Sequence, residues 1–485
     1  MLKQILTDIN NLAGQEGLRV YAVGGCIRDL LLGLEPIDID LAVPGAGIFS
    51  FAKKLAAYTG AAFVPLDPIN KVARVIISRG GEKLQLDIAA FKGLGIIEDL
   101  CNRDFTINAL AVPLEAYLSG KIEESTIDPT GGLNDLRKGK IRATGAAAFT
   151  SDPVRVLRAF RLSAKLNFSI TKDTLTLMKV ARGALSASSP ERVLEELLQI
   201  LELPGSFTQV KLMDRELLLF DEIFPRVKQM RVMKQNNHHT ENVWVHSLST
   251  LHQLESDILP SIPDKLAKAV IPYLNEVVAA GRSRLPSLKL ACLLHDAGKI
   301  DTCKVQLDGK ITFHGHERAG IKYVSEFSSG LRLGAKERAI LEMLVKRHMH
   351  PLQLYTNRGN ISRAAIYRFF RAAGREAPGC LLLSMADLAA SRRSTGRTGE
   401  IQEYKAFIYS LMEKYFFAER EFVSPPKLVT GKDLISKFGL RPSKQIGDIL
   451  DKISEAQVEG AVAGRQDAMR LAAKILGTEL KLEPE

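Results

Sequence analysis

Over the first 145 residues, short segments with the pattern of strands alternate with segments of helical period. Residues 18–23 alternate and are rich in β-branched side chains, which predicts a strand. Residues 38–43 and 83–91 predict two more strands, and most glycine turns of the chain lie in this region. The pattern therefore predicts an α/β domain over residues 1–145.

Strand signals fade after residue 146, and helical periodicity takes over. Residues 153–166 and 190–201 carry apolar side chains at helical spacing, with Ser189 as the expected N-cap and Pro190 in the first turn. We expect a helical neck over residues 146–224, a third region over 225–415 and a short helical tail over 420–485. The fold class expected is α+β.

Composition adds constraints on partners and location. A chain of 485 residues is too long for one core. Lys and Arg outnumber Asp and Glu by 66 to 55, for a net charge of +11, which suits a polyanionic partner or simply solubility. Five cysteines without a C-x-x-C pair predict reduced thiols and a cytoplasmic protein. Neither a signal peptide nor a run of 18 apolar residues is apparent, so no membrane partner is expected.

The most informative chemistry lies between residues 23 and 43. Gly24 and Gly25 allow a sharp turn, and a helix expected to begin at Arg28 would offer free N–H groups to a phosphate. Asp38 and Asp40 share one face of the next strand, because side chains alternate across a strand. Alone, the glycines would fit a plain turn and the aspartates a solvated edge strand, but together they predict nucleotidyl transfer.

Two carboxylates on one face can bridge two Mg²⁺ ions roughly 4 Å apart, the arrangement used for phosphoryl displacement. Asp38 and Asp40 are the predicted Mg²⁺ ligands and catalytic residues, and Asp87 on the strand at 83–91 is a plausible third carboxylate.

The histidines are gathered between residues 238 and 350. His246, His295, Asp296 and Asp387 are candidate ligands for a divalent transition metal, which His and carboxylate bind well. Such a metal would activate water for phosphoester hydrolysis. His316, with His348 or His350, would add a second metal or hold a substrate phosphate.

Several motifs in order resemble bacterial class II tRNA nucleotidyltransferases and their poly(A) polymerase relatives, with an HD domain in the second half. The matching segments are residues 23–29, 38–40, 102–110, 128–142, 152–161, 189–197 and 428–447. The resemblance implies a nucleotidyltransferase-superfamily head, an all-α neck, an HD domain and a helical tail.

The resemblance also implies roles for single residues. Arg103 would contact the triphosphate and Asp104 a ribose hydroxyl, with Asn108 in the same motif. Arg28 would support the triphosphate and Asp29 the loop geometry. The segment at 152–161 resembles the base-reading helix, with nucleotide-binding positions at Asp152, Arg155, Arg158 and Arg161.

Two positions depart from the family pattern. Residue 102 is Asn where the family usually has Arg, which would weaken triphosphate contacts. Residue 151 is Ser where the family usually has Glu, which removes a brace of the base-reading pair.

The base-reading pair has a chemical rationale. Three residues apart on a helix, Asp152 and Arg155 would be neighbours, one accepting and the other donating hydrogen bonds. Cytosine and adenine offer the complementary pattern, whereas guanine and uracil would leave polar groups unpaired at about 1–3 kcal/mol each. Outside this family, the three arginines would read as a solvated basic stripe with Asp152 as an N-cap.

The expected activity is addition of CMP, AMP or both to a tRNA 3′ end from CTP and ATP, with no DNA partner. A basic run at Arg137, Lys138, Lys140 and Arg142 would bind RNA phosphates or form a solvated face. Three alternatives remain open: poly(A) synthesis on general RNA 3′ ends, an HD phosphohydrolase with an idle head, and a non-catalytic RNA-binding protein. The sequence does not separate CCA, CC-only and A-only addition.

Overall fold

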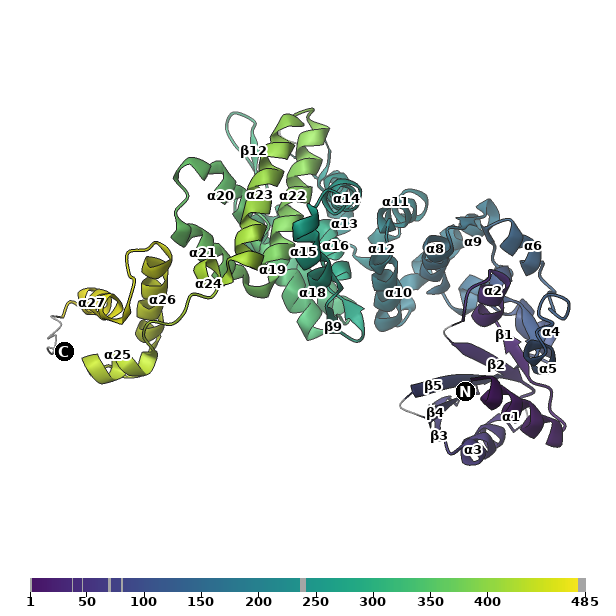
Figure 1. The fold of residues 1–485 in the computed structure, drawn as a ribbon. Helices are drawn as coiled ribbons and strands as arrows, with labels where there is room; N and C mark the ends of the chain where they lie inside the picture. The colour runs from purple at the N-terminus through teal and green to yellow at the C-terminus, as the bar shows by residue number, and fades with distance from the viewer. Residues whose placement is uncertain are drawn as a thin grey trace. The chain divides into compact units, whose positions relative to one another are not determined.

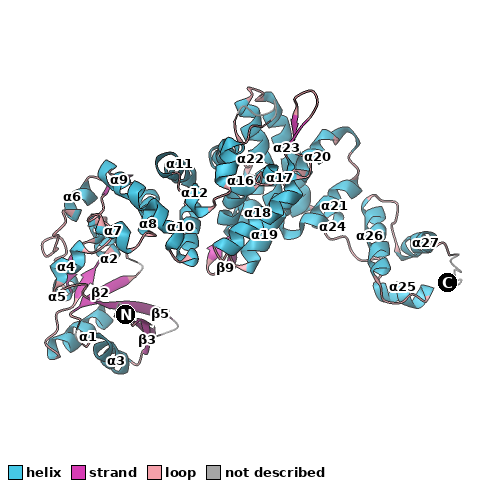
Figure 2. Cartoon of the chain, turned by 180° about the vertical axis from the view of Figure 1, so that it is seen from behind, coloured by secondary structure: helices cyan, strands magenta, loops and turns pink. Residues whose placement is uncertain are grey.

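The computed structural model describes residues 2–36, 38–45, 47–68, 71–79, 82–235 and 241–478. The chain forms two compact units (Figure 1). The first contains residues 1–203 and 212–223, and the second contains residues 204–211 and 224–485. A mixed sheet dominates the start of the first unit, and helices make up most of the rest (Figure 2). The predicted α+β class is confirmed.

The sheet of the first unit has six strands in the order β3-β4-β5-β2-β1-β6. Only β2 and β5 pair in parallel; the other neighbours are antiparallel. The strands are β1 (Tyr21–Val23), β2 (Ile39–Val43), β3 (Ala62–Asp67), β4 (Val72–Arg79), β5 (Glu82–Ala90) and β6 (Ala111–Pro113).

The two faces of this sheet differ in what they bury. One face packs Leu41 and Ile88 against apolar side chains of α1 (Leu2–Gln15) and α3 (Ile48–Thr59), forming the main core. On the other face Val23 and Ala42 form a smaller cluster with Leu100 of α4 (Ile96–Cys101). Because side chains alternate along a strand, polar residues between the core positions point away from α1 and α3.

Helices complete the first unit, and α8 packs against α10. The further helices up to residue 223 are α2 (Gly25–Leu31), α5 (Leu114–Leu118), α6 (Gly132–Arg137), α7 (Ala147–Ser151), α8 (Arg155–Leu166), α9 (Lys172–Ala181), α10 (Pro190–Glu202), α11 (Ser206–Leu217) and α12 (Phe220–Ile223), with the short parallel pair β7 (Lys140–Ile141) and β8 (Ser169–Ile170).

The second unit is helical apart from two small antiparallel pairs. These are β9 (Val277–Ala279) with β10 (Arg282–Ser283), and β11 (Lys304–Val305) with β12 (Ile311–Thr312). Its helices are α13 (Val227–Val232), α14 (Val243–Gln253), α15 (Asp264–Asn275), α16 (Leu285–Leu294), α17 (Lys299–Thr302), α18 (His316–Gly330), α19 (Ala335–Arg347), α20 (His350–Thr356), α21 (Arg363–Ala373), α22 (Ala377–Ser394), α23 (Gly399–Phe417), α24 (Glu419–Phe422), α25 (Gly431–Phe438), α26 (Lys444–Val458) and α27 (Arg465–Leu476).

Three predicted element boundaries were wrong. Helix α2 begins at Gly25, not at Arg28, with Gly24 at its N-cap in a positive-φ conformation that favours glycine (φ 77°). Asp38 lies in a bend just before β2. Asp152 ends α7 in an extended conformation and therefore precedes α8.

The predicted helix at 190–201 is confirmed as α10, with Ser189 at the N-cap. The Ser189 hydroxyl donates to Glu191, however, and does not cap the helix backbone. Residues 479–485 of the expected tail lie outside the described residues. Among the helices described, none is both long and apolar enough to cross a membrane.

Gly132 tests the packing of the first turn of α6 against the backbone of Thr106. A Cβ placed there would lie 2.1 Å from the carbonyl oxygen of Thr106, so backbone must move. We expect Gly132→Ala to lower the free energy of unfolding of the first unit by about 2 kcal/mol or more. Gly183→Ala is the matched control, because nothing lies within 4 Å of its Cβ position. Thermal and urea unfolding measure both; equal stability of the two variants would contradict this packing.

Candidate functional site

Two aspartates lie opposite each other on the sheet face that α1 and α3 leave uncovered. The parallel register pairs Asp40 of β2 with Asp87 of β5, and the antiparallel register pairs Asp87 with Arg74 of β4. Arg74 donates to both oxygens of Asp87, from Nε at 2.7 Å and from Nη2 at 2.8 Å. Asp87 is therefore held by an arginine, whereas Asp40 is exposed.

The environment of Asp40 disfavours its charge. Partial exclusion of water raises the pKa of Asp40, the negative charges of Asp87 and Asp38 raise it further, and Arg103 opposes them. Asp38 is exposed in the bend before β2. Carboxylates that crowd one another in this way are typical of a site for a divalent cation, because bound positive charge removes the repulsion. The residues present thus fit Mg²⁺, which prefers oxygen ligands.

Gly24 allows an arginine to approach the carboxylates. A Cβ at Gly24 would meet Arg103 Nη1 at 3.0 Å and Asp40 Oδ2 at 3.9 Å. Arg103 is oriented by Asp99, whose Oδ2 accepts from its Nε at 3.1 Å and its Nη2 at 3.0 Å. A larger residue than glycine would therefore displace the arginine predicted to contact the triphosphate. Gly25 has looser surroundings, with Arg28 Nη2 at 3.5 Å from its Cβ position.

A chain of hydrogen bonds links α2 to α8. Arg28 donates to Asn108 Oδ1 at 2.7 Å, and Asn108 donates to Asp104 Oδ1 at 3.1 Å. Arg158 donates to the other oxygen of Asp104 at 3.3 Å. Arg28 is only 5% exposed and also binds Asp29, so it braces the loop from inside. Its predicted support of the triphosphate stays a prediction.

Asp152 and Arg155 come together although Asp152 precedes the helix. Arg155 Nε lies 3.8 Å from Asp152 Oδ2, and Arg192 of α10 donates to the same oxygen at 2.7 Å. Burial would raise the pKa of Asp152, but the hydrogen bond from Arg192 brings it below its usual value. Arg155 is 9% exposed, and its Nε has no hydrogen-bond partner among the described residues.

Glu196 of α10 organises the other two arginines of α8. It accepts from Arg158 Nε at 3.1 Å and from Arg161 Nε at 2.6 Å. Burial would lower the pKa of Arg158, but Asp104 and Glu196 raise it, so its charge is secure. Arg158 and Arg161 are therefore paired and do not form the solvated stripe considered above.

Many of the predicted residues border one cavity of about 540 Å³. Arg28 and Asn108 do not line it but connect to it through Asp104. The other predicted residues that do not line it are Gly24, Gly25, Asp38, Asp152 and Arg161. The predicted residues that do line it are Asp40, Asp87, Arg103, Asp104, Arg155 and Arg158.

Sequence reasoning missed four partners of these residues. Arg74, Asp99, Arg192 and Glu196 each hold a predicted residue in place. Opposite charge is the only signal that each carries in the sequence. Charge alone does not distinguish these four residues from the other charged residues of the chain; the strand register and the packing of α10 are also needed.

The positions that depart from the family pattern have local partners. Asn102 ends α4 and donates to the carbonyl of Glu98 at 2.9 Å. Ser151 reaches only the carbonyl of Ala148, at 3.4 Å, and no hydrogen bond joins it to the Arg155 side chain among the described contacts.

Most of the predicted basic run is engaged within the first unit. Arg142 binds Asp135 at 2.7 Å, Arg137 binds Glu123 at 2.6 Å, and Lys140 donates to Ser169 at 2.9 Å. These contacts leave Lys138 as the exposed member without a described side-chain partner.

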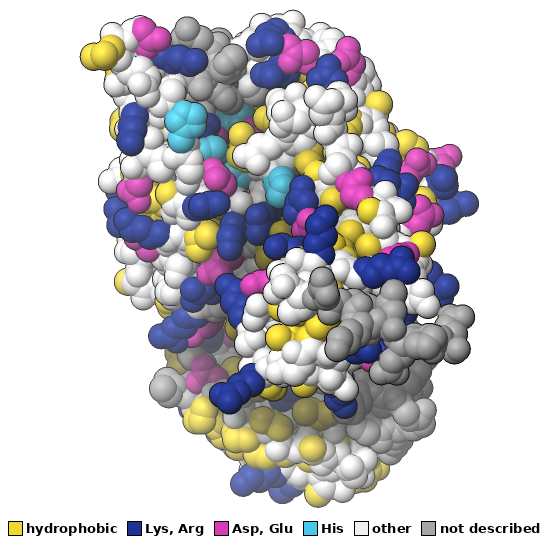
Figure 3. Space-filling view, turned by 90° about the vertical axis from the view of Figure 1, so that its left-hand side faces the viewer, with side chains coloured by type: hydrophobic (Ala, Val, Ile, Leu, Met, Phe, Trp, Pro, Cys, Tyr) yellow, Lys and Arg dark blue, Asp and Glu magenta, His cyan; other side chains and the backbone are white. Residues whose placement is uncertain are grey.

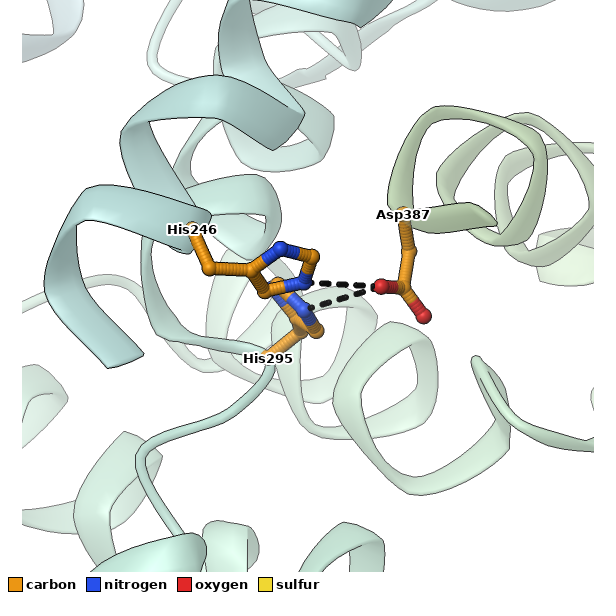
Figure 4. Close-up of side chains that lie close together, drawn as sticks. All are labelled: His246, His295 and Asp387. Carbon is orange, nitrogen blue, oxygen red and sulfur yellow. Dashed lines mark hydrogen bonds and ion pairs between the residues drawn. The ribbon is translucent and has the colours of Figure 1, made fainter. Parts of the chain in front are cut away.

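In the second unit, histidines and aspartates from five helical segments converge. His246 of α14 and His295, at the end of α16, face one oxygen of Asp387 of α22, with Nε2 at 2.9 Å and 3.7 Å (Figure 4). Asp296 lies 3.3 Å from both His295 and His316. His348 Nε2 is 3.2 Å from His316 Nε2.

The tautomers of these histidines are fixed from outside the cluster. Nδ1 of His295, His316 and His348 each faces the carbonyl three residues earlier, at 2.9, 2.9 and 2.7 Å. Since a carbonyl only accepts, Nδ1 carries hydrogen, and in the neutral form of each ring Nε2 presents a lone pair inward. His295 Nε2 is buried without a hydrogen-bond partner. The donor set therefore fits a divalent transition metal.

Charge in this cluster is strongly coupled. Burial would lower the pKa of His295, but Asp296 and Asp387 raise it to about 10. Burial lowers the pKa of His348 to about 3. Burial would raise the pKa of Asp296, yet Lys299 and His295 hold it well below its usual value. Lys299, which donates to Asp296 and Gln235 at 2.6 Å, was not anticipated from the sequence.

The choice between His348 and His350 is resolved. His348 joins the cluster, whereas the ring of His350 packs against Phe369 with centroids 5.2 Å apart. His238 and His239 lie outside the described residues.

Comparison with known proteins places the chain in a family. Family models match residues 20–142 as "Poly A polymerase head domain", 167–230 as "Probable RNA and SrmB-binding site of polymerase A", and 422–473 as tRNA nucleotidyltransferase domain 2. The "Multifunctional CCA protein" of Neisseria gonorrhoeae is 30% identical over 341 residues, covering 68% of this chain and 74% of that protein. The chain belongs to the tRNA nucleotidyltransferase family.

Other relatives in this family span almost the whole chain. The "CC-adding tRNA nucleotidyltransferase" of Synechocystis sp. is 27% identical, covering 93% of this chain and 92% of its own. The "A-adding tRNA nucleotidyltransferase" of Deinococcus radiodurans is 29% identical, covering 92% and 93%. The Thermotoga maritima CCA-adding enzyme in complex with tRNA shares the fold at 22% identity, with a TM-score of 0.62 over 97% of this chain and 95% of that one.

Glu196→Gln tests the support of the arginines on α8. Gln keeps the shape but removes the charge between Arg158 and Arg161, so two half-buried guanidinium groups lose their counter-ion. We expect a loss of about 2–4 kcal/mol in the free energy of unfolding, measured by urea denaturation. Glu195→Gln is the matched control, because glutamine can still accept the hydrogen bond from Gln199. A Glu196→Gln protein as stable as its control would contradict the described network.

Proposed function

We propose that the protein adds CMP, AMP or both to the 3′ end of tRNA, using CTP and ATP and releasing pyrophosphate. One observation carries this proposal: a single cavity is bordered by the carboxylates of the sheet and by the arginines of α8. Asp40 and Asp87 are suited to Mg²⁺ that would bind the reacting phosphates, and Arg155 is suited to the base. Family membership supports the same activity.

The head residues divide the work by chemistry. Asp38 and Asp40, with Asp87, would hold Mg²⁺, which supplies charge neutralisation and a more acidic 3′-hydroxyl when bound. Arg103 points past Gly24 toward Asp40, where its free Nη1 can donate to a phosphate oxygen. Asp99 fixes the orientation of that guanidinium group, which reduces the entropy lost on binding.

Base selection would depend on two groups with opposite hydrogen-bonding roles. Arg192 keeps Asp152 ionised, so Asp152 can accept from an exocyclic amine. The buried Nε of Arg155 lies in ion-pair range of Asp152 but makes no hydrogen bond among the described residues, so it is available as a donor to a ring nitrogen. Cytosine and adenine match this pair, and a mismatched base would leave a buried donor unsatisfied.

We propose the domain boundaries from this division. Residues 1–145 form the nucleotidyltransferase head, 146–224 the neck that reads the base, 225–415 an HD-type domain and 420–485 the helical tail. The match of residues 422–473 to a tRNA nucleotidyltransferase domain supports a role for the tail in handling tRNA.

Terminal addition is the deciding experiment. The protein is incubated with Mg²⁺, radiolabelled CTP or ATP, and tRNAs that lack one, two or three terminal nucleotides. CC, A, CCA and a long A-tail give products of different length, so the assay also tests poly(A) synthesis. Absence of addition to every tRNA would overturn the transferase proposal.

A second activity is favoured by the cluster of His246, His295, Asp296 and Asp387. We propose that it binds a divalent transition metal and hydrolyses phosphoesters, with water supplying the oxygen that replaces the alcohol. The inward-facing Nε2 atoms support this proposal, as does His295 Nε2, which lies close to Asp296 and Asp387 without a hydrogen bond among the described residues.

Asp40→Asn separates chemistry from folding. A carboxyl group whose pKa is raised by folding destabilises the metal-free protein at pH values above its unfolded pKa, because its charged form is disfavoured. We therefore expect Asp40→Asn to slow nucleotide addition about a thousandfold or more. The melting temperature of the metal-free variant at pH 7 should be no lower than that of the wild-type protein. Below about pH 4 any difference in melting temperature should vanish. Addition at wild-type rate would contradict the assignment.

Loss of the transition metal from the His/Asp cluster should leave nucleotide addition to tRNA unchanged. We expect His295→Ala and Asp387→Ala to lose bound transition metal, measured by mass spectrometry of metals after dialysis, and to retain terminal addition. His314→Ala is the control, because His314 lies two residues before His316 but makes no described contact with the cluster. Unchanged metal content in Asp387→Ala would overturn the assignment of these ligands.

A further inference from the structure

Two adjoining cavities lie at the His/Asp cluster, and the larger of them is lined by positively charged side chains. The cluster opens into a cavity of about 380 Å³ that Asp296, His316 and Asp387 border. A neighbouring cavity of about 700 Å³ shares Glu317, Met349 and Gln353 with it. The two cavities therefore adjoin each other, and we call the larger one the basic trough.

Three cations line the basic trough: Arg318 of α18, and Lys346 and Arg347 in the last turn of α19. Glu317 is the carboxylate that lines it with them. In the described part of the chain, no carboxylate lies within ion-pair distance of these three side chains, and Arg347 Nε is buried without a hydrogen-bond partner. Figure 3 shows histidine side chains beside a group of Lys and Arg side chains on one face.

Nearby arginines behave differently. Arg338 pairs with Glu342 at 2.7 Å, Arg368 with Glu455 at 2.8 Å, and Arg392 with Glu400 at 2.6 Å. Within the cavity of the cluster, Lys299 is likewise paired with Asp296. Positive charge is thus left unmatched in the trough, whereas its neighbours are neutralised. Cations in a concave site raise the local concentration of an anionic ligand.

The chain order connects trough and cluster closely. Arg347 directly precedes His348, and Arg318 follows His316 by two residues. The histidines face the cluster while the cations line the trough. A ligand with one phosphoryl group at the cluster would therefore have a cationic site for another beside it.

We propose that the basic trough binds a second phosphoryl group of the substrate of the His/Asp cluster. The substrate is then a phosphoester that bears two phosphoryl groups, either a free nucleotide or an RNA end. This inference rests on the proposed phosphohydrolase function of the cluster, but binding in the trough requires no metal.

Binding is tested without metal or turnover. The full-length protein is acetylated with an amine-reactive ester in EDTA, with inorganic pyrophosphate as the probe, and acetylation of each lysine is read by peptide mass spectrometry. We expect pyrophosphate to protect Lys346 and to leave the exposed Lys427 unprotected, at constant ionic strength set with sodium chloride. In Arg318→Gln/Arg347→Gln, the concentration for half-protection should rise about tenfold. No protection at millimolar pyrophosphate would overturn the inference.

Hydrolysis then tests the substrate class. With Mn²⁺, kcat/KM is measured for adenosine 3′,5′-bisphosphate, adenosine 3′-phosphate and an oligoribonucleotide with a 3′-phosphate. The preference is the ratio of kcat/KM for the bisphosphate, or for the oligoribonucleotide if RNA is the source, to kcat/KM for the monophosphate. We expect this ratio to fall about tenfold in Lys346→Gln/Arg347→Gln. Arg420→Gln/Lys427→Gln, which removes equal charge from exposed positions, should retain the preference. An unchanged preference in the trough variant would overturn the inference.

The two arms also separate the inference from the function it rests on. If none of the three esters is hydrolysed, the phosphohydrolase proposal fails, and protection of Lys346 alone decides whether the trough binds phosphate.

Discussion

The parallel pairing of β2 with β5 is the constraint on which the head depends. It places Asp40 opposite Asp87 on the sheet face that α1 and α3 do not cover. Exclusion of water and, after it, the like charge of Asp87 disfavour the charged form of Asp40, and its raised pKa reflects that cost. Arg74 and Arg103 offset part of that cost without enclosing Asp40. The sheet thus presents Asp40 and Asp87 on an uncovered face, where a bound cation would stabilise their negative charges.

Helix α10 plays the complementary part for the cationic side of the cavity. Three arginines on one side of α8 would repel one another, yet Glu196 joins two of them, and Arg192 instead steadies Asp152. Asp104 then ties Arg158 to the loop that Arg28 and Asn108 brace. Helix α8 is consequently held by hydrogen bonds to α10 and, through Asp104 and Asn108, to Arg28 of α2 within the first unit.

The sequence predicted the class of fold, the strands that carry Asp40 and Asp87, and the segment that carries Arg155. These features depend on local pattern, because alternation and glycine turns act over a few residues. It did not predict that Arg74 would hold Asp87 or that Glu196 would hold Arg161, since strand register and helix packing are set by distant segments. Helix edges were wrong at Gly24 and Asp152, where backbone conformation and not periodicity decides the boundary. For the His/Asp cluster, the order of residues predicted which side chains converge, but the choice of His348 over His350 required the packing of His350 against Phe369.

Iron-directed cleavage tests the central claim most directly. Fe²⁺ can replace Mg²⁺ at carboxylate sites, and with ascorbate and peroxide it cuts the backbone beside its ligands. With CTP present, the account predicts cuts near residues 38–41 and 86–88, suppressed by excess Mg²⁺. Cuts confined to residues elsewhere in the chain, with β2 and β5 intact, would contradict it.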